Sequence, residues 1–233
     1  MFSTLLIHGC GHHSGEPTSF SFNVAPSFPG SSWEQQTTLP APETWASKDI
    51  SEAEGCLELS LQNRISEGRI GVTFSALVVS ATKGGKDVRP SLPESVCLKF
   101  AKQEFCRSLA REAWFYEQLA DSCQGTSVPR CYGFFSSTMG EQPGYPDVTF
   151  IPWEKRIYRL EDTDDVLSWD NPSPDWLPDD QPGAQKYISD LSGYKSGSPW
   201  YTWQRSEHNP TLAVLVLDLL GKTCTGVRAG KVK

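Results

Sequence analysis

Alternating apolar and polar positions in the middle of the chain predict a series of short strands. The leucines of residues 57–61 alternate with polar residues, which is the period of a half-buried strand. A glycine-containing stretch, 66–71, separates them from a second apolar run over 72–80, so the two runs are expected to form a hairpin. Turn residues follow, and a third strand is expected over 95–101.

The hydrophobic period changes from two to between three and four over residues 103–120. The apolar positions that define this face are Phe105, Leu109, Ala113, Tyr116 and Ala120. This spacing predicts a helix with one buried face. A short strand over 128–135 and an apolar strand over 211–220 complete the pattern. We therefore expect an α+β fold with a twisted antiparallel five-stranded sheet and one main helix.

Composition divides the chain around this structured region, which spans 56–221. Residues 1–55 are rich in Ser, Thr, Pro and Gly, with aromatic residues at no regular period, and are expected to form a disordered N-terminal tail. Residues 141–210 carry thirteen acidic and six basic side chains, nine of the seventeen prolines and five of the eight tryptophans. This stretch is expected to be a long irregular acidic insertion, and 222–233 a second tail.

Charge and cysteine content narrow the possible functions. The net charge of −7 lies entirely within the insertion, which argues against nucleic acid as a partner because phosphate contacts need clustered basic residues. The seven cysteines are odd in number and contain no C-x-x-C pair, so a reducing compartment is expected, either cytoplasmic or nuclear. No apolar run approaches the roughly 20 residues of a membrane helix, and the N-terminus lacks a secretory signal.

Two clusters of potential metal ligands are assigned no metal. The stretch from His8 to His13 contains three histidines and Cys10, but it lies in the expected tail and has no supporting residues around it. The carboxylates of 161–165 lack the glycine and terminal glutamate of a calcium-binding loop. We interpret the second cluster as a solvated charged loop.

Three groups of residues carry candidate chemistry. The segment 66–71 reads Ser-Glu-Gly-Arg-Ile-Gly, and glycines in a turn allow backbone amides to approach phosphate groups. Lys99 lies near the end of the third strand. Glu112 lies on the apolar face of the helix, where an unpaired carboxylate is costly, so Lys99 is its expected partner. Glu117 is rotated away from this face and is expected to reach solvent.

These motifs, in this order over 57–221, resemble the N-terminal lobe of a protein kinase. The glycine-rich loop G-x-G-x-x-G-x-V appears with Ser66 at the first glycine and Thr73 at the valine, and the V-A-I-K strand appears as Val96 to Lys99. Glu112 follows Lys99 by only thirteen residues, which is a shorter connection than the family usually shows. The amino-acid sequences of these segments are most similar to those of protein-kinase-domain proteins of mushroom-forming fungi.

The resemblance implies an ATP site on the expected sheet. Lys99 and Glu112 would form the ion pair that anchors phosphates, Leu217 would be the gatekeeper, and Asp218 would begin the hinge. The nucleotide-binding residues implied in this way are Ile65, Ser66, Gly68, Gly71, Thr73, Cys97, Lys99, Leu217, Asp218 and Leu220. The family's activity is ATP-dependent phosphoryl transfer to protein.

The motifs that would complete this chemistry are absent from these 233 residues. No H-R-D or D-F-G sequence occurs, so the catalytic base and the magnesium ligands are missing. We expect an incomplete protein kinase-like chain that binds ATP weakly and transfers no phosphate alone. Small-molecule phosphotransferases share the same lobe, so the chain could equally resemble that family.

The alternative function is a non-enzymatic interaction module. The five tryptophans of 141–210 would dock a protein partner, since large aromatic side chains are favoured anchors of interfaces. The competing interpretation is that these rings pack onto their own domain.

Overall fold

The structure, a computed structural model, describes residues 1–30, 46–119, 123–154, 177 and 198–220. Within these residues the strands are β1 (Thr4–His13), β2 (Glu16–Val24), β3 (Cys56–Glu67), β4 (Gly71–Lys83), β5 (Lys86–Asp87), β6 (Ser95–Ala101), β7 (Cys131–Thr138), β8 (Val148–Phe150) and β9 (Thr211–Asp218). The described helices are α1 (Cys106–Gln118) and the short 3₁₀ turns η2 (Arg89–Ser91), η3 (Met139–Glu141) and η4 (Ile151–Trp153). None of these helices is long and apolar enough to cross a membrane.

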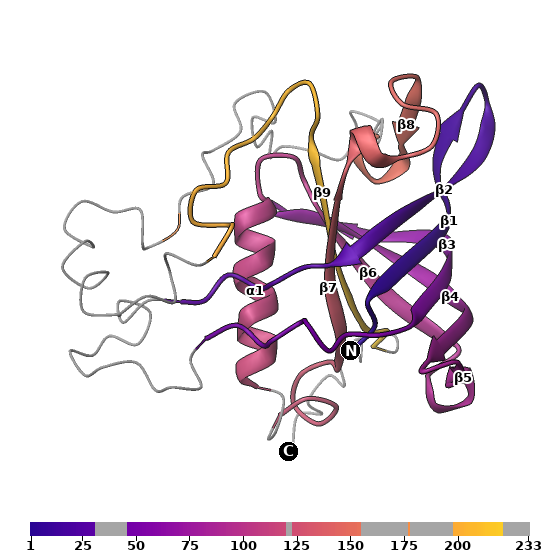
Figure 1. Ribbon diagram of the computed structural model, residues 1–233. Helices are drawn as coiled ribbons and strands as arrows, with labels where there is room; N and C mark the ends of the chain where they lie inside the picture. Colours follow the sequence, from indigo (N-terminus) through magenta and orange to yellow (C-terminus); the bar gives the residue numbers. More distant parts are fainter. Residues whose placement is uncertain (31–45, 120–122, 155–176, 178–197, 221–233) are drawn as a thin grey trace, which may run out of the picture.

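The described strands form one sheet, and seven of them close into a barrel (Figure 1). The order around the ring is β2–β7–β9–β6–β4–β3–β1, and β1 pairs again with β2. All these pairs are antiparallel except β1 with β3, which run parallel. The seam between β2 and β7 is short, with Asn23 opposite Ser136 and Val24 opposite Phe135. Strand β8 pairs with β1 and β5 pairs with β4, both outside the ring.

This closure overturns the expected fold class. The strands anticipated from the sequence are present as β3, β4, β6, β9 and β7, but they do not form an open five-stranded sheet. Residues 4–24, expected to be disordered, form β1 and β2 and join β3 to β7. The physical reason is burial: Leu5, Ile7, Phe20 and Phe22 are fully inaccessible to solvent in the barrel core.

Aromatic side chains fill the interior of the barrel. Phe20 stacks on Phe150 with ring centroids 5.2 Å apart. Phe100 packs edge-on against Phe150 at 5.5 Å and against Phe74 at 5.9 Å. Phe150 belongs to β8, so this strand contributes to the core although it lies outside the ring. The interior is therefore a packed core, and a binding site has to be sought on the outside or at an end.

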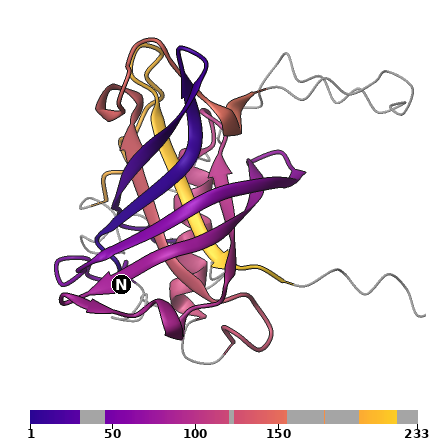
Figure 2. The ribbon, with the colours of Figure 1, turned by 90° about the vertical axis from the view of Figure 1, so that its right-hand side faces the viewer.

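Helix α1 packs against the outside of the barrel, beside β7 and β9 (Figures 1 and 2). Its buried face carries Leu109, Ala110 and Ala113, which share a second core with Leu215 and Phe134. The alanines allow the helix backbone to come close to the strands. The outer side chains of the strands beside the helix are thus partly covered, whereas Leu77 and Val79 of β4 are 40% and 50% exposed.

Candidate functional site

Lys99 and Glu112 form an ion pair between β6 and α1. Lys99 Nζ donates to Glu112 Oε1 at 2.8 Å and to Glu112 Oε2 at 2.6 Å. Their side chains are 24% and 27% exposed. Contact with both oxygens fixes the ammonium group, although solvent screening limits a pair this exposed to about 1 kcal/mol. The structure thus places these two residues in contact, and their role in anchoring a nucleotide stays a prediction.

Strand pairing positions Lys99. Val96, Leu98 and Phe100 point into the barrel, so the alternation of β6 directs Lys99 to the outer face. Lys99 lies opposite Thr73 of β4 and opposite Leu215 of β9. The ammonium group therefore stands on an outer face bounded on one side by the helix and on the other by β4 and β3.

Titratable groups next to the ion pair are kept in their protonated forms. Burial, followed by the charge of Glu112, raises the pKa of Tyr116 to about 12. Burial also raises the pKa of Cys97, and the charge of Lys99 only partly opposes this shift. Burial raises the pKa of Cys131 to about 12. A protonated thiol or phenol is a poor nucleophile, so the arrangement suits binding better than covalent chemistry.

The two glycines of the expected phosphate loop have different surroundings. The backbone amide of Gly68 donates to the carbonyl of Gly71 at 2.9 Å, so it closes the turn between β3 and β4. A methyl carbon added at Gly71 would lie 2.3 Å from the carbonyl oxygen of Phe100, whereas one added at Gly68 would meet open space apart from Gly71 O at 4.0 Å. Strand packing alone thus requires glycine at position 71.

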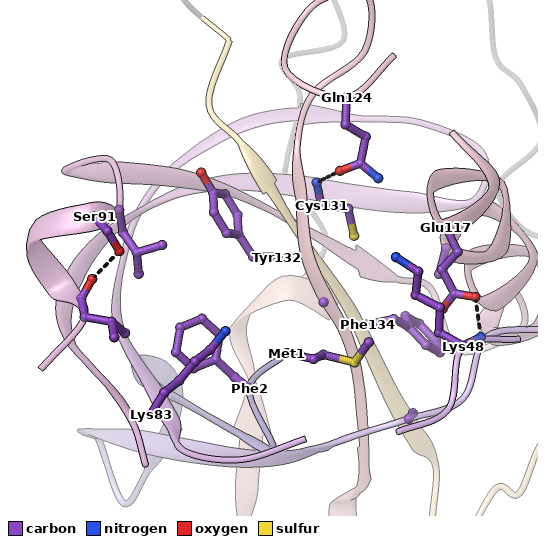
Figure 3. Close-up of a pocket in the computed structure, with 15 residues that line it drawn as sticks. Met1, Phe2, Lys48, Lys83, Ser91, Glu117, Gln124, Cys131, Tyr132 and Phe134 are labelled. Atoms are coloured by element: carbon purple, nitrogen blue, oxygen red, sulfur yellow. Dashed lines mark hydrogen bonds between the residues drawn. The ribbon is translucent and has the colours of Figure 1, made fainter. Parts of the chain in front are cut away.

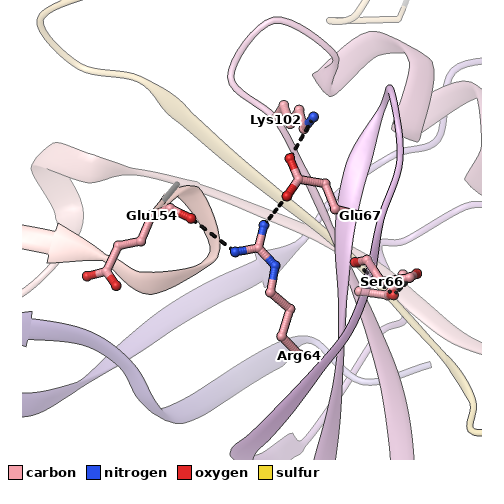
Figure 4. Close-up of polar contacts among 6 residues, drawn as sticks. Arg64, Ser66, Glu67, Lys102 and Glu154 are labelled. Carbon is pink, nitrogen blue, oxygen red and sulfur yellow. Dashed lines mark hydrogen bonds and ion pairs between the residues drawn. The ribbon is translucent and has the colours of Figure 1, made fainter. Parts of the chain in front are cut away.

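A polar network beneath this turn was not anticipated from the sequence (Figure 4). Glu67 accepts one hydrogen bond from Arg64 and pairs with Lys102 Nζ at 2.9 Å. Arg64 Nη1 also donates to the carbonyl of Glu154 at 3.0 Å, so the end of β3 is tied to the residue after η4. All three charged side chains of Arg64, Glu67 and Lys102 are less than one-fifth exposed. This network holds the turn in one position.

The remaining residues implied by the resemblance are spread over four neighbouring strands. Ser66 and Thr73 lie opposite each other on β3 and β4 and share a hydrogen bond of 2.6 Å between their hydroxyls. Cys97 lies opposite Leu217, which is only 7% exposed and packs in the same core as α1. The side chain of Leu217 is therefore buried in the core that includes α1 and is not available to a ligand.

Ile65 and Leu220 lie at the margins of this face, and both are exposed, by 50% and 67%. Asp218 lies opposite Val96, three residues along β6 from Lys99, or about 10 Å. Its carboxylate accepts from Tyr132 Oη at 2.5 Å and from the amide of Arg130 at 3.1 Å. These contacts fix Asp218 to the start of β7, away from the ion pair.

Three of the five tryptophans of the insertion pack on their own domain. Trp200 is 4% exposed, and its indole Nε1 donates to the carbonyl of Pro26 at 2.6 Å. Trp153 Nε1 donates to the carbonyl of Ala101 at 2.9 Å, and Trp203 Nε1 donates to Thr211 Oγ1 at 3.0 Å. These three rings favour packing over docking. Trp169 and Trp176, together with residues 161–165 and 222–233, lie outside the described residues.

The histidine stretch lies on β1 and makes polar contacts across the sheet. His8 Nδ1 and Ser19 Oγ are 2.8 Å apart, and His8 Nε2 and Glu58 Oε1 are 2.5 Å apart. Ser80 Oγ donates to the other oxygen of Glu58 at 2.6 Å. This chain of contacts joins four adjacent strands. Among the described residues, no three potential ligands gather into a metal-binding group.

Comparison with protein-family models, curated proteins and solved structures finds no match to this chain. The kinase resemblance therefore rests on the motifs in the sequence alone, and the site must be judged on its geometry.

Proposed function

We propose that the outer face around Lys99 binds the phosphate groups of a nucleotide weakly and without transferring them. The observation that carries this proposal is the partly exposed ion pair of Lys99 with Glu112, beside the hydroxyls of Thr73 and Ser66. An ammonium group has three protons to donate, and the carboxylate of Glu112 accepts two of them. The third is left for a phosphate oxygen, and Glu112 holds the donor in place.

One exposed apolar side chain close to the ion pair supports a place for the base. Ile65 precedes Ser66, whose hydroxyl contacts Thr73 opposite Lys99, and its side chain is 50% exposed. Leu220 lies two residues beyond Asp218, further from Lys99, and takes no part in this site. A flat heterocycle packed against such side chains removes apolar surface from water. Together with Lys99, Ile65 makes a nucleotide a better match than a simple phosphate ion.

Binding on this face is expected to be weak. The amide of Gly68 is engaged by Gly71, so the turn between β3 and β4 leaves that amide no proton for a phosphate. The contact with Lys99 also stands on an open face, where water and salt screen it. One charge-assisted contact and partial stacking correspond to a dissociation constant of about 1 mM or weaker.

The sequence motifs support a family for this activity. We propose a relationship to protein kinase-like proteins on these motifs alone, since the closed barrel is not the fold of a kinase N-terminal lobe. These 233 residues contain no H-R-D or D-F-G motif to supply a base or magnesium ligands for phosphoryl transfer. We also place it in the cytoplasm or nucleus, because Cys10, Cys56, Cys97 and Cys131 are free thiols.

Titration calorimetry with magnesium-ATP and with adenosine tests this function. ATP is expected to bind with a dissociation constant of about 1 mM or weaker, and adenosine more weakly still. Lys99→Met should abolish the advantage of ATP, and Lys86→Met, which alters an exposed lysine of β5, is the matched control. Equal binding of ATP and adenosine, or equal effects of the two substitutions, contradicts the site. Transfer of radiolabelled phosphate by the pure chain that is lost in Lys99→Met contradicts the absence of catalysis.

A further inference from the structure

A cavity of about 390 Å³ lies at one end of the barrel, where β1 begins and β4 ends (Figure 3). Its lining includes neither Lys99 nor Glu112, so it is separate from the face proposed above. Phe2, Leu92 and Phe134 contribute apolar walls, and Lys48 and Lys83 bring the cationic side chains. The volume is within the range of sites that enclose small organic molecules.

Lys83 is a cation of this cavity that forms no ion pair with a described residue. Its side chain points into the cavity, and its Nζ lies 4.4 Å from the ring centroid of Phe2 (Figure 3). No carboxylate of the described residues lies within salt-bridge distance of Lys83. The amino group of Met1 is a neighbour, and its pKa is lowered by burial and then by Lys83, with Glu54 opposing the shift. Positive charge thus gathers here, and Glu54, the acid near Gly84, forms no ion pair with Lys83.

The opposite side of the cavity carries Lys48 together with an acid, Glu117. Glu117 Oε2 accepts from Ser27 Oγ at 2.7 Å and from the amide of Lys48 at 3.0 Å. Burial raises the pKa of Glu117, and the charge of Lys48 partly opposes that shift. Glu117 therefore lies on the Lys48 side of the cavity, whereas Lys83 points into the cavity from the other side (Figure 3) and is the group proposed to meet an anion.

We infer that this cavity binds a small organic carboxylate with an apolar body, of the kind represented by a medium-chain fatty acid. The carboxylate contacts Lys83, where an ammonium and a carboxylate form a charge-assisted hydrogen bond. The apolar body lies against Phe2, Leu92 and Phe134, which removes its surface from water. A small inorganic anion must also lose its hydration to enter, but it makes no apolar contact with these walls. The cavity is therefore expected to bind it more weakly.

Titration calorimetry with octanoate, 1-octanol and inorganic phosphate on the whole chain tests the inference. Octanoate is expected to bind about tenfold or more tightly than octanol, as one charge-assisted contact implies. Lys83→Met keeps the length and apolar stem of the side chain, and it should remove this advantage while leaving octanol binding unchanged. Lys86→Met, three residues further along the same hairpin, is the control and should leave both affinities unchanged.

A second substitution tests the apolar wall independently of charge. Leu92→Ser should weaken octanoate and octanol by a similar factor of about five or more, because both ligands lose the same contact. Equal affinity for octanoate and octanol, equal effects of Lys83→Met and Lys86→Met, or phosphate binding as tight as octanoate would each overturn the inference. Circular dichroism of every variant shows whether the barrel is intact. The test is independent of nucleotide binding, which Lys99→Met reports.

Discussion

Gly71 and Phe100 approach each other so closely that a methyl carbon added at Gly71 would lie 2.3 Å from the carbonyl oxygen of Phe100. Gly71 begins β4 and lies opposite Ala101 of β6 in the barrel. The glycine is therefore required by the spacing of two strands, whether or not a phosphate binds nearby. Gly68, the other glycine of the turn, has no such neighbour.

The first prediction separates these two glycines. Gly71→Ala is expected to lower the free energy of unfolding by about 3 kcal/mol, because β4 and β6 must separate to admit the methyl group. Gly68→Ala should change it by no more than about 0.5 kcal/mol. Urea denaturation followed by tryptophan fluorescence measures both. Similar values for the two variants would show that β4 and β6 do not meet as described.

The second prediction concerns β1 as a part of the barrel. Ile7 is fully buried in the core, whereas Leu77 of β4 is 40% exposed on the outside. Ile7→Ala should lower the free energy of unfolding by about 2 to 5 kcal/mol, the range for truncating a buried aliphatic side chain. Leu77→Ala should cost about 0.5 kcal/mol or less. If residues 4–13 lay outside the core, the two substitutions would have equally small effects in urea denaturation.

The N-terminal hairpin escaped the sequence analysis because its hydrophobic period is interrupted. Leu5 and Ile7 alternate as a strand should, but the register shifts between Ile7 and Gly11, and the next buried apolar side chain is Cys10. Gly9 adopts a positive φ of 67° at this irregularity. A bulge of this kind adds a residue and ends the alternation after two positions. The available signal was the turn at 14–15, with positive φ at both residues.

The contact of Lys99 with Glu112 could be predicted from the sequence, because the hydrophobic period of a single strand or helix determines the direction of each side chain. Alternation along β6 directs Lys99 outward, and the helical period directs Glu112 toward the strands. The network of Arg64, Glu67 and Lys102 was not accessible in this way. Arg64 and Glu67 follow register shifts in β3, and Lys102 comes from beyond β6, so no local pattern links them. The cavity around Lys83 depends in the same way on barrel closure.

The third prediction tests whether the insertion packs or docks. The ring of Trp200 lies 5.7 Å from that of Phe134, and its Nε1 donates to the carbonyl of Pro26. Trp200→Ala is expected to lower the free energy of unfolding by about 3 to 5 kcal/mol, as for other buried aromatic side chains. Tyr201→Ala, next in sequence and 38% exposed, should cost about 1 kcal/mol or less. A fully stable Trp200→Ala protein that loses a bound partner would favour docking instead.

The fourth prediction concerns Glu117, which sequence reasoning placed toward solvent. In the structure its carboxylate contacts Ser27 and the segment before β3, and burial raises its pKa above the ordinary value. The folded state therefore holds this proton to a higher pH than the unfolded state does. Linkage then requires stability to fall as pH rises from the unfolded pKa, about 4.3, to the folded pKa.

Glu117→Gln should remove this contribution without breaking the local contacts, because both hydrogen bonds reach the same oxygen, Oε2, and an amide oxygen can accept two. The variant is expected to gain stability relative to the natural protein as pH rises above about 4.3, and the difference should become constant above the folded pKa. Urea midpoints between pH 4 and pH 8 measure this difference, with Glu52→Gln at an exposed position as the control. A difference that is independent of pH, or that grows as pH falls, would contradict a buried Glu117 with a raised pKa.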